Sequence, residues 1–125
     1  MSFRSPLARA RGLGAAHSGT HHWWIQRLTS VALMPLLLWF AVSFASLATA
    51  DYATATAWLR HPLNAVLMLA LLGNIFHHML VGMQVVIEDY IHGRGAKIAV
   101  LIVVKFSIAL LAIGAIFAVL KVAFS

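Results

Sequence analysis

Three long runs of apolar residues, separated by short polar segments, dominate the chain. They cover residues 28–50, 63–87 and 98–119. At 1.5 Å of helical rise per residue, each run is long enough to cross the roughly 30 Å hydrocarbon core of a bilayer. None shows the apolar–polar alternation or the ~10-residue length of membrane barrel strands. The pattern therefore predicts an all-α integral membrane protein with three transmembrane helices.

Composition supports this placement in lipid. Of the 125 residues, 62% are hydrophobic and only 10% are charged, so too few polar side chains are present to cover a soluble domain. The chain has no cysteine, which excludes disulfides and cysteine-ligated zinc or iron–sulfur centres built from this chain alone. Any redox metal held here needs another ligand, and seven histidines are available.

Most of the charged residues flank the apolar runs, and Lys105 lies inside the third. The chain has nine Lys and Arg residues and three Asp and Glu residues, which gives a net charge of +6. With the charges spread among the spans, the chain has no single basic soluble face, and we predict no nucleic-acid partner. Three spans place six basic residues on the side of the N-terminus and second loop: Arg4, Arg9, Arg11, Arg27, Arg94 and Lys97.

Only Arg60 and Lys121 lie on the opposite side. The positive-inside rule therefore predicts a cytoplasmic N-terminus and a C-terminus outside. Residues 1–27 are expected to form a basic cytoplasmic arm with an interfacial His/Trp segment, which can order against anionic lipid or a partner, and residues 28–125 the transmembrane domain.

The second span holds most of the polar side chains predicted to lie in lipid: Asn64, Asn74, His77, His78 and Gln84. Such residues are costly there, and they mark a functional helix. His78 precedes Glu88 by ten residues, roughly 15 Å along a helix, which places it near the bilayer centre. An imidazole at this depth either bonds a neighbouring helix or ligates haem iron. Gly82 follows His78 by one turn, but Gly73 precedes His77 by one turn, so the residues alone leave both histidines open.

Two further clusters lie at the predicted cytoplasmic interface. Asp89 and Tyr90 end the second span, where a tyrosine either belongs to the aromatic belt or hydrogen-bonds the head of a quinone. Arg27 follows two tryptophans before the first span, as a membrane anchor or as the partner of a carboxylate such as a haem propionate. Lys105 can reach the same border for a lipid or propionate role.

Two motifs together resemble one family, the hydrophobic membrane anchor of bacterial succinate dehydrogenase, respiratory complex II. The first motif precedes the first span and the second ends the second span, and the residues are Gly19, His21, Arg27, Thr29, His78, Gly82, Met83, Asp89 and Tyr90. The resemblance covers nearly the whole chain and is strongest toward the alphaproteobacterial and mitochondrial-like branch.

The resemblance implies a role for each matching position. His78 would be an axial ligand to the iron of haem b, and Arg27 would lie near the haem propionates and the quinone pocket. Tyr90 would hydrogen-bond ubiquinone, with Asp89 beside it. His22 stands where some members have aspartate, so that residue's part in proton delivery does not transfer.

The resemblance also implies the partners and the setting. A second hydrophobic anchor, the cytochrome b subunit, would share the helical bundle and the haem. An iron–sulfur subunit and a flavoprotein would hold the iron–sulfur clusters and FAD and pass electrons from succinate to ubiquinone, in the bacterial inner membrane. Three alternatives stay open: the anchor of a quinol:fumarate reductase, a stand-alone di-haem cytochrome b, and a structural subunit or small transporter. Because the first and third runs contain no histidine, they disfavour the di-haem cytochrome.

Overall fold

The computed structural model describes Leu7 and residues 19–125. Its helices are α2 (Gly19–Leu47), α3 (Tyr52–Arg60), α4 (Pro62–Tyr90) and α5 (Arg94–Ala123), and no strand occurs in this part of the chain. Three of them, all but α3, are long and apolar enough to cross a membrane. The prediction of an all-α protein with three transmembrane helices is confirmed.

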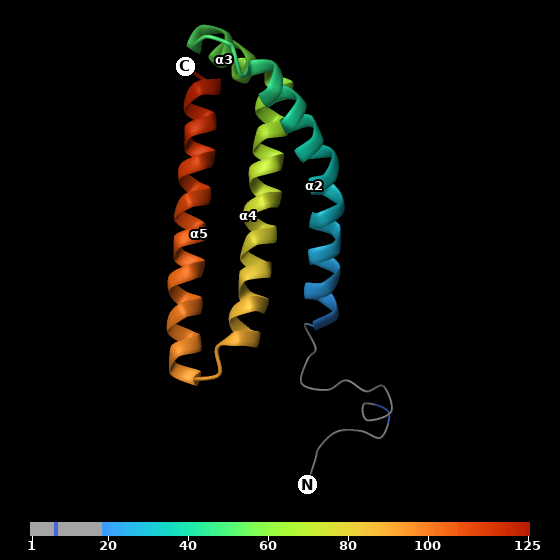
Figure 1. Cartoon of the computed structure of the whole chain (residues 1–125), viewed down its shortest axis with the longest axis vertical. Coiled ribbons are helices and arrows are strands. Elements are labelled where there is room, and N and C mark those ends of the chain that lie inside the picture. Colours follow the sequence, from blue (N-terminus) through green and yellow to red (C-terminus); the bar gives the residue numbers. More distant parts are fainter. Residues whose placement is uncertain (1–6, 8–18) are drawn as a thin grey trace.

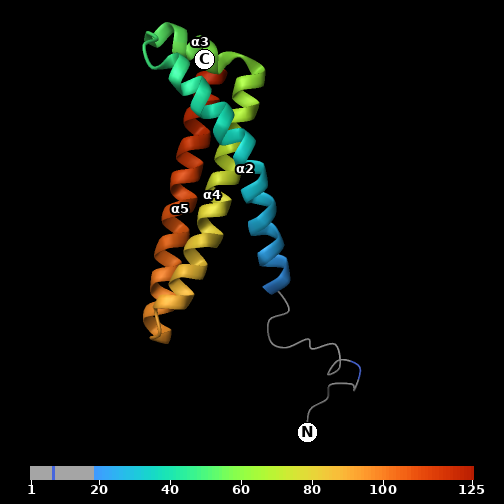
Figure 2. The same ribbon diagram turned by 45° about the vertical axis from the view of Figure 1, so that its right-hand side comes forward.

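The three long helices lie side by side with α4 in the middle (Figure 1). Helix α4 packs against both α2 and α5, so it is the central element of the bundle. Helix α2 crosses α4 and diverges from it toward its own N-terminal end (Figure 2). The bundle is therefore closed at the end that holds α3 and open at the other end between α2 and α4.

Few side chains are buried within the chain. The buried apolar residues lie mostly where α4 meets its neighbours: Leu33, Ala65, Leu71, Val81, Ile87, Ile108 and Val119. About half of the large apolar side chains on α2, α4 and α5 are exposed instead. In a membrane protein these exposed faces are available for lipid or for other helices, because lipid tails are as apolar as the side chains.

The helices extend beyond the apolar runs that predicted them. Helix α2 begins at Gly19, ahead of the run at 28, because its first turns contain polar and aromatic residues that lie outside the apolar run used for the prediction. The His/Trp segment is thus part of the first helix. Helices α4 and α5 likewise include polar residues at both ends. The remainder of the predicted N-terminal arm, Leu7 apart, lies outside the described residues.

The short helix α3 was not predicted. Its N-cap is Asp51, whose side chain accepts a hydrogen bond from the backbone N–H of Thr54 at 2.9 Å. Hydrogen bonding to Thr54, from its side chain and then from this backbone N–H, lowers the pKa of Asp51 below its usual value, because it stabilises the carboxylate. Helix α3 ends before His61, which is extended as expected for a residue preceding proline, and Pro62 opens α4.

Side chains of α3 tie the closed end together. Trp58 stacks on Trp39 of α2 with ring centroids 5.6 Å apart. The amide nitrogen of Asn64 donates to the backbone oxygen of Trp58 at 2.9 Å, and Arg60 donates to Ser125 Oγ at 3.2 Å. Helices α2, α4 and the end of α5 are therefore all joined through α3.

Candidate functional site

The two adjacent histidines of α4 have different surroundings. His78 is half-buried against α2, with Nδ1 3.2 Å from Thr29 Oγ1 and Nε2 3.4 Å from the side-chain nitrogen of Gln26. His77 is exposed and lines a separate groove of about 240 Å³ between α4 and α5, together with Gly73. Consecutive helical residues point about 100° apart, which accounts for the separation.

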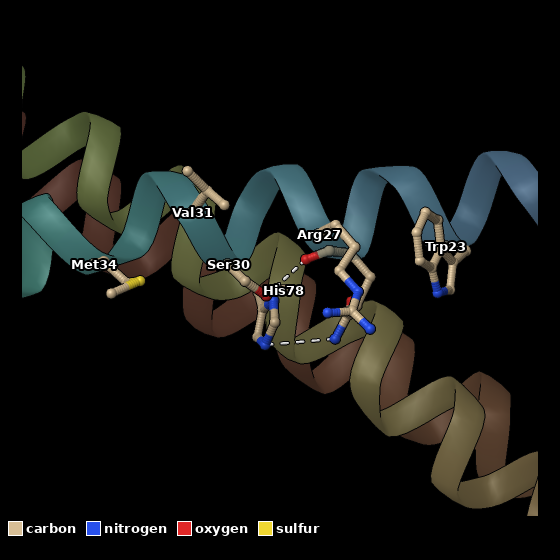
Figure 3. Close-up of a pocket in the computed structure, with 7 residues that line it drawn as sticks. Trp23, Arg27, Ser30, Val31, Met34 and His78 are labelled. Atoms are coloured by element: carbon tan, nitrogen blue, oxygen red, sulfur yellow. Dashed lines mark hydrogen bonds between the residues drawn. The ribbon is translucent and has the colours of Figure 1, made fainter.

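His78 lies in a pocket of about 520 Å³ between α2 and α4. The pocket is lined by Trp23, Gln26, Arg27, Ser30, Val31, Met34 and His78. Only His78 comes from α4, and Figure 3 shows its ring turned toward α2. The volume lies in the range of small-molecule and cofactor sites in proteins, about 300–1,000 Å³.

Arg27 supplies the positive charge of this pocket. Its guanidinium carbon lies 5.1 Å from the centre of the Trp23 ring, within the range of a cation–π contact. The side chain is otherwise exposed, so its donors can reach an anionic group at the pocket's edge. The structure thus brings Arg27 and His78, which are far apart in sequence, to one pocket.

The donor set of the pocket fits the haem that the resemblance implies. His78 provides an imidazole nitrogen, Val31 and Met34 provide apolar surface for a macrocycle, and Arg27 can pair with a propionate. Within the part of the chain that the structure describes, the side-chain oxygen of Gln26 is buried without a hydrogen-bond partner. His78 would hold the iron and Arg27 a propionate.

Gly82 lies one turn from His78 on α4 and faces Gln26. A Cβ atom added to Gly82 would lie 3.8 Å from the side-chain nitrogen of Gln26, an ordinary van der Waals distance. The absence of a side chain therefore leaves space beside Gln26, but the glycine does not relieve a clash.

Asp89 and Tyr90 lie outside this pocket, at the exposed C-terminal end of α4. Neither side chain makes a hydrogen bond within residues 19–125. Their neighbour Glu88 is tied locally, since its carboxylate accepts from Gln84 at 2.8 Å and its backbone oxygen accepts from Lys97 Nζ at 3.1 Å. The phenol and the Asp89 carboxylate are thus presented outward at the end of α4.

The other residues singled out in the sequence lie outside the pocket. His22 is exposed in the first turns of α2, and Lys105 is exposed on α5. His21 and His22 both fall within α2, so the first helix does contain histidines, contrary to the expectation from the run at 28–50. Within the described residues, no group of three or more His, Cys, Asp or Glu side chains could hold a metal ion.

Sequence reasoning missed Gln26 altogether and treated Thr29 only as a motif position. Both contact His78. The signal that could have found them is their spacing, because residues three apart on a helix lie on one face. Polar residues at this spacing inside an otherwise apolar helix indicate a partner on the facing helix.

Comparison with known proteins identifies a matching family. The succinate dehydrogenase/fumarate reductase transmembrane subunit family matches residues 1–114. A succinate dehydrogenase hydrophobic membrane anchor subunit from Rickettsia bellii is 38% identical over 108 residues, covering 85% of this chain and 86% of the relative.

Two further similar proteins have the same description. The one from Rickettsia conorii is 32% identical over 104 residues, covering 82% of each chain. The one from Paracoccus denitrificans is 30% identical over 114 residues, covering 90% of this chain and 87% of the relative. The matched segments span nearly the full length of both partners in each comparison.

Proposed function

The chain belongs to the succinate dehydrogenase/fumarate reductase transmembrane subunit family, and we propose that it is the membrane anchor of a succinate:ubiquinone oxidoreductase. In that complex it helps to bind haem b and forms part of the ubiquinone site. The single observation that supports this most directly is the pocket between α2 and α4, which His78 and Arg27 both line. An imidazole and a guanidinium at one apolar pocket match the needs of a haem with its propionates.

The haem, when bound, supplies a one-electron redox centre within the membrane. His78 would hold the haem iron and Arg27 would pair with a propionate. A second hydrophobic anchor, the cytochrome b subunit, would pack with this chain in one helical bundle and complete the site. The unpartnered Gln26 oxygen and the exposed apolar faces of the helices support a site that is completed by another chain.

The remaining redox groups belong to other subunits. Because the chain has no cysteine, it cannot hold the iron–sulfur clusters, and electrons reach the membrane from an iron–sulfur subunit. FAD and the oxidation of succinate belong to the flavoprotein subunit. This chain's part begins where ubiquinone accepts two electrons and two protons to become ubiquinol.

Tyr90 and Asp89 serve that last step. The phenol O–H of Tyr90 donates a hydrogen bond to a carbonyl oxygen of the quinone head. Asp89, beside it, orients the phenol or relays protons from the cytoplasm. The exposure of both side chains at the end of α4 supports this role, because an incoming quinone can approach them without breaking an internal hydrogen bond.

The haem assignment is tested by replacing each of the adjacent histidines in the intact complex. We expect His78→Ala to remove or strongly alter the low-spin haem bands in the reduced-minus-oxidised spectrum. His77→Ala is the matched control, because His77 is the neighbouring residue but lines a different groove, and it should leave the spectrum unchanged. An unchanged spectrum in His78→Ala, or a lost one in His77→Ala, would contradict the assignment.

A further inference from the structure

Thr29 of α2 has a position unlike that of any other polar residue in the structure. It is the only buried polar residue among those described, with 9% of its surface exposed. Its hydroxyl lies 2.9 Å from the backbone oxygen of Ile25, 3.0 Å from that of Gln26 and 3.2 Å from Nδ1 of His78. A single hydroxyl therefore joins the α2 backbone to the imidazole of α4.

The number of hydrogens in this cluster determines which atoms donate and which accept. A backbone oxygen can only accept, so the one hydrogen of the Thr29 hydroxyl is donated to the Ile25 and Gln26 oxygens. The lone pairs of Oγ1 are then left to accept from His78, which requires that Nδ1 bear the proton. In a neutral imidazole the other nitrogen, Nε2, then has a free lone pair.

The contact on the other side of the ring agrees with this assignment. The side-chain nitrogen of Gln26 carries two hydrogens and no lone pair for bonding, so at 3.4 Å it faces Nε2 of His78 as a donor. A donor suits a nitrogen with a lone pair. Both neighbours from α2 thus favour the tautomer with hydrogen on Nδ1.

We propose that Thr29 is a positioning residue that holds His78 in the tautomer needed to bind iron. Its hydroxyl keeps the proton on Nδ1 and leaves the Nε2 lone pair facing the side-chain nitrogen of Gln26 in the pocket, where that lone pair would be available to iron. Histidines that ligate metals generally donate from their second nitrogen to such an acceptor, which raises the basicity of the ligand. This inference rests on the proposed role of His78 as the haem ligand.

The test compares three variants in the purified intact complex. Thr29→Val removes the hydroxyl and keeps the shape, whereas Thr29→Ser keeps the hydroxyl. Thr56→Val in α3 is the matched control, because the Thr56 hydroxyl donates to backbone oxygens at the same distances, 2.9 and 3.0 Å, but contacts no imidazole. The readouts are the haem-to-flavin ratio, the g values of the low-spin haem signal, and the haem midpoint potential.

We expect Thr29→Val to shift the g values and raise the midpoint potential, because a less basic imidazole stabilises ferric iron less. Haem affinity should fall about 10- to 100-fold, as is typical when the partner of a metal-ligating histidine is removed. Thr29→Ser and Thr56→Val should resemble the parent. If Thr29→Val does not assemble, Thr29→Ala replaces it, since it adds no bulk.

Parent-like g values and potential in the hydroxyl-free variants would overturn the proposal, as would an equal shift in Thr56→Val. Failure of both hydroxyl-free variants to assemble would overturn it too, because Thr29 would then be a packing residue. The His78→Ala complex separates this result from the proposed function. If His78→Ala loses haem while Thr29→Val is unchanged, only the positioning role fails. If His78→Ala keeps its spectrum, the haem assignment itself fails.

Discussion

At the scale of single residues, Tyr90 is an aromatic side chain whose hydroxyl is accessible from outside the chain. It is the last residue of α4, and 79% of its surface is exposed. A tyrosine that only anchors the protein in the membrane interface needs no defined partner for its hydroxyl. A quinone-binding tyrosine needs that hydroxyl, so removing the oxygen atom alone distinguishes the two roles.

We therefore predict that Tyr90→Phe lowers ubiquinone reduction by about tenfold, the effect of losing one hydrogen bond of about 1.4 kcal/mol in the transition state. Succinate oxidation with an artificial dye that bypasses the membrane should be unchanged. Both activities are measured on the same purified complex.

The chain offers a matched control in its only other tyrosine, Tyr52. Tyr52 is equally exposed, at 84%, but it begins α3 at the opposite end of the bundle. Tyr52→Phe should leave both activities unchanged. An equal loss of quinone and dye activity in Tyr90→Phe would indicate damaged assembly and contradict the quinone role.

The sequence could single out the histidine pair of the second span but could not separate His78 from His77. Both have a glycine one turn away and both lie at mid-depth in the span. What distinguishes their surroundings is the face of α4 that packs against α2, which depends on where the two helices cross. For the same reason Gln26 was missed and Thr29 was treated only as a motif position, because their importance lies in a contact with a residue about fifty positions away.

At the scale of whole helices, the hydrophobic runs predicted the three spans well but did not predict the short helix α3. A span is dictated by the thickness of the bilayer, so its length can be read from composition. Helix α3 contains alanines, threonines and one arginine, and its residues are placed by an N-cap and by contacts with Trp39 and Asn64. The signal that could have found α3 is Asp51, because Asp is among the preferred N-cap residues.

We predict that α3 depends on this cap. Asp51→Ala should speed hydrogen exchange of the Thr54 amide several-fold in the purified complex, because that N–H loses its acceptor. Asp51→Asn retains an acceptor oxygen and should exchange close to the parent rate. Equal exchange in the parent and in Asp51→Ala would show that α3 is held by its packing alone.

The same cap should respond to acid in a defined direction. Hydrogen bonding to Thr54 lowers the pKa of Asp51 relative to the unfolded value of 3.8, so the carboxylate stabilises α3 above that value. Its contribution falls as the pH drops through the lowered pKa of the folded state. Exchange of the Thr54 amide, corrected for its intrinsic rate, should therefore accelerate in that range for the parent but not for Asp51→Asn.

At the scale of the molecule, the bundle has two unlike ends. The end with α3 is closed by aromatic stacking and hydrogen bonds, whereas α2 and α4 diverge toward the other end (Figure 2). The pocket is lined by α2 residues between 23 and 34 and by His78, near the middle of α4. The open end holds Arg27, Arg94 and Lys97. The positive-inside rule predicts that this end faces the cytoplasm, where an iron–sulfur partner would deliver electrons and protons would enter.

This orientation can be tested cleanly because the chain has no cysteine. A single cysteine at His92, between α4 and α5, should be shielded from a membrane-impermeant maleimide in intact spheroplasts and labelled only after lysis. A cysteine at Ala57, exposed on α3, should be labelled in both. The parent protein is the control for background. Labelling of His92→Cys before lysis would show that the topology is the reverse of the predicted one. Asp89 and Tyr90 would then receive protons from the outer side, and the proposed quinone site would face the wrong compartment for its electron donor.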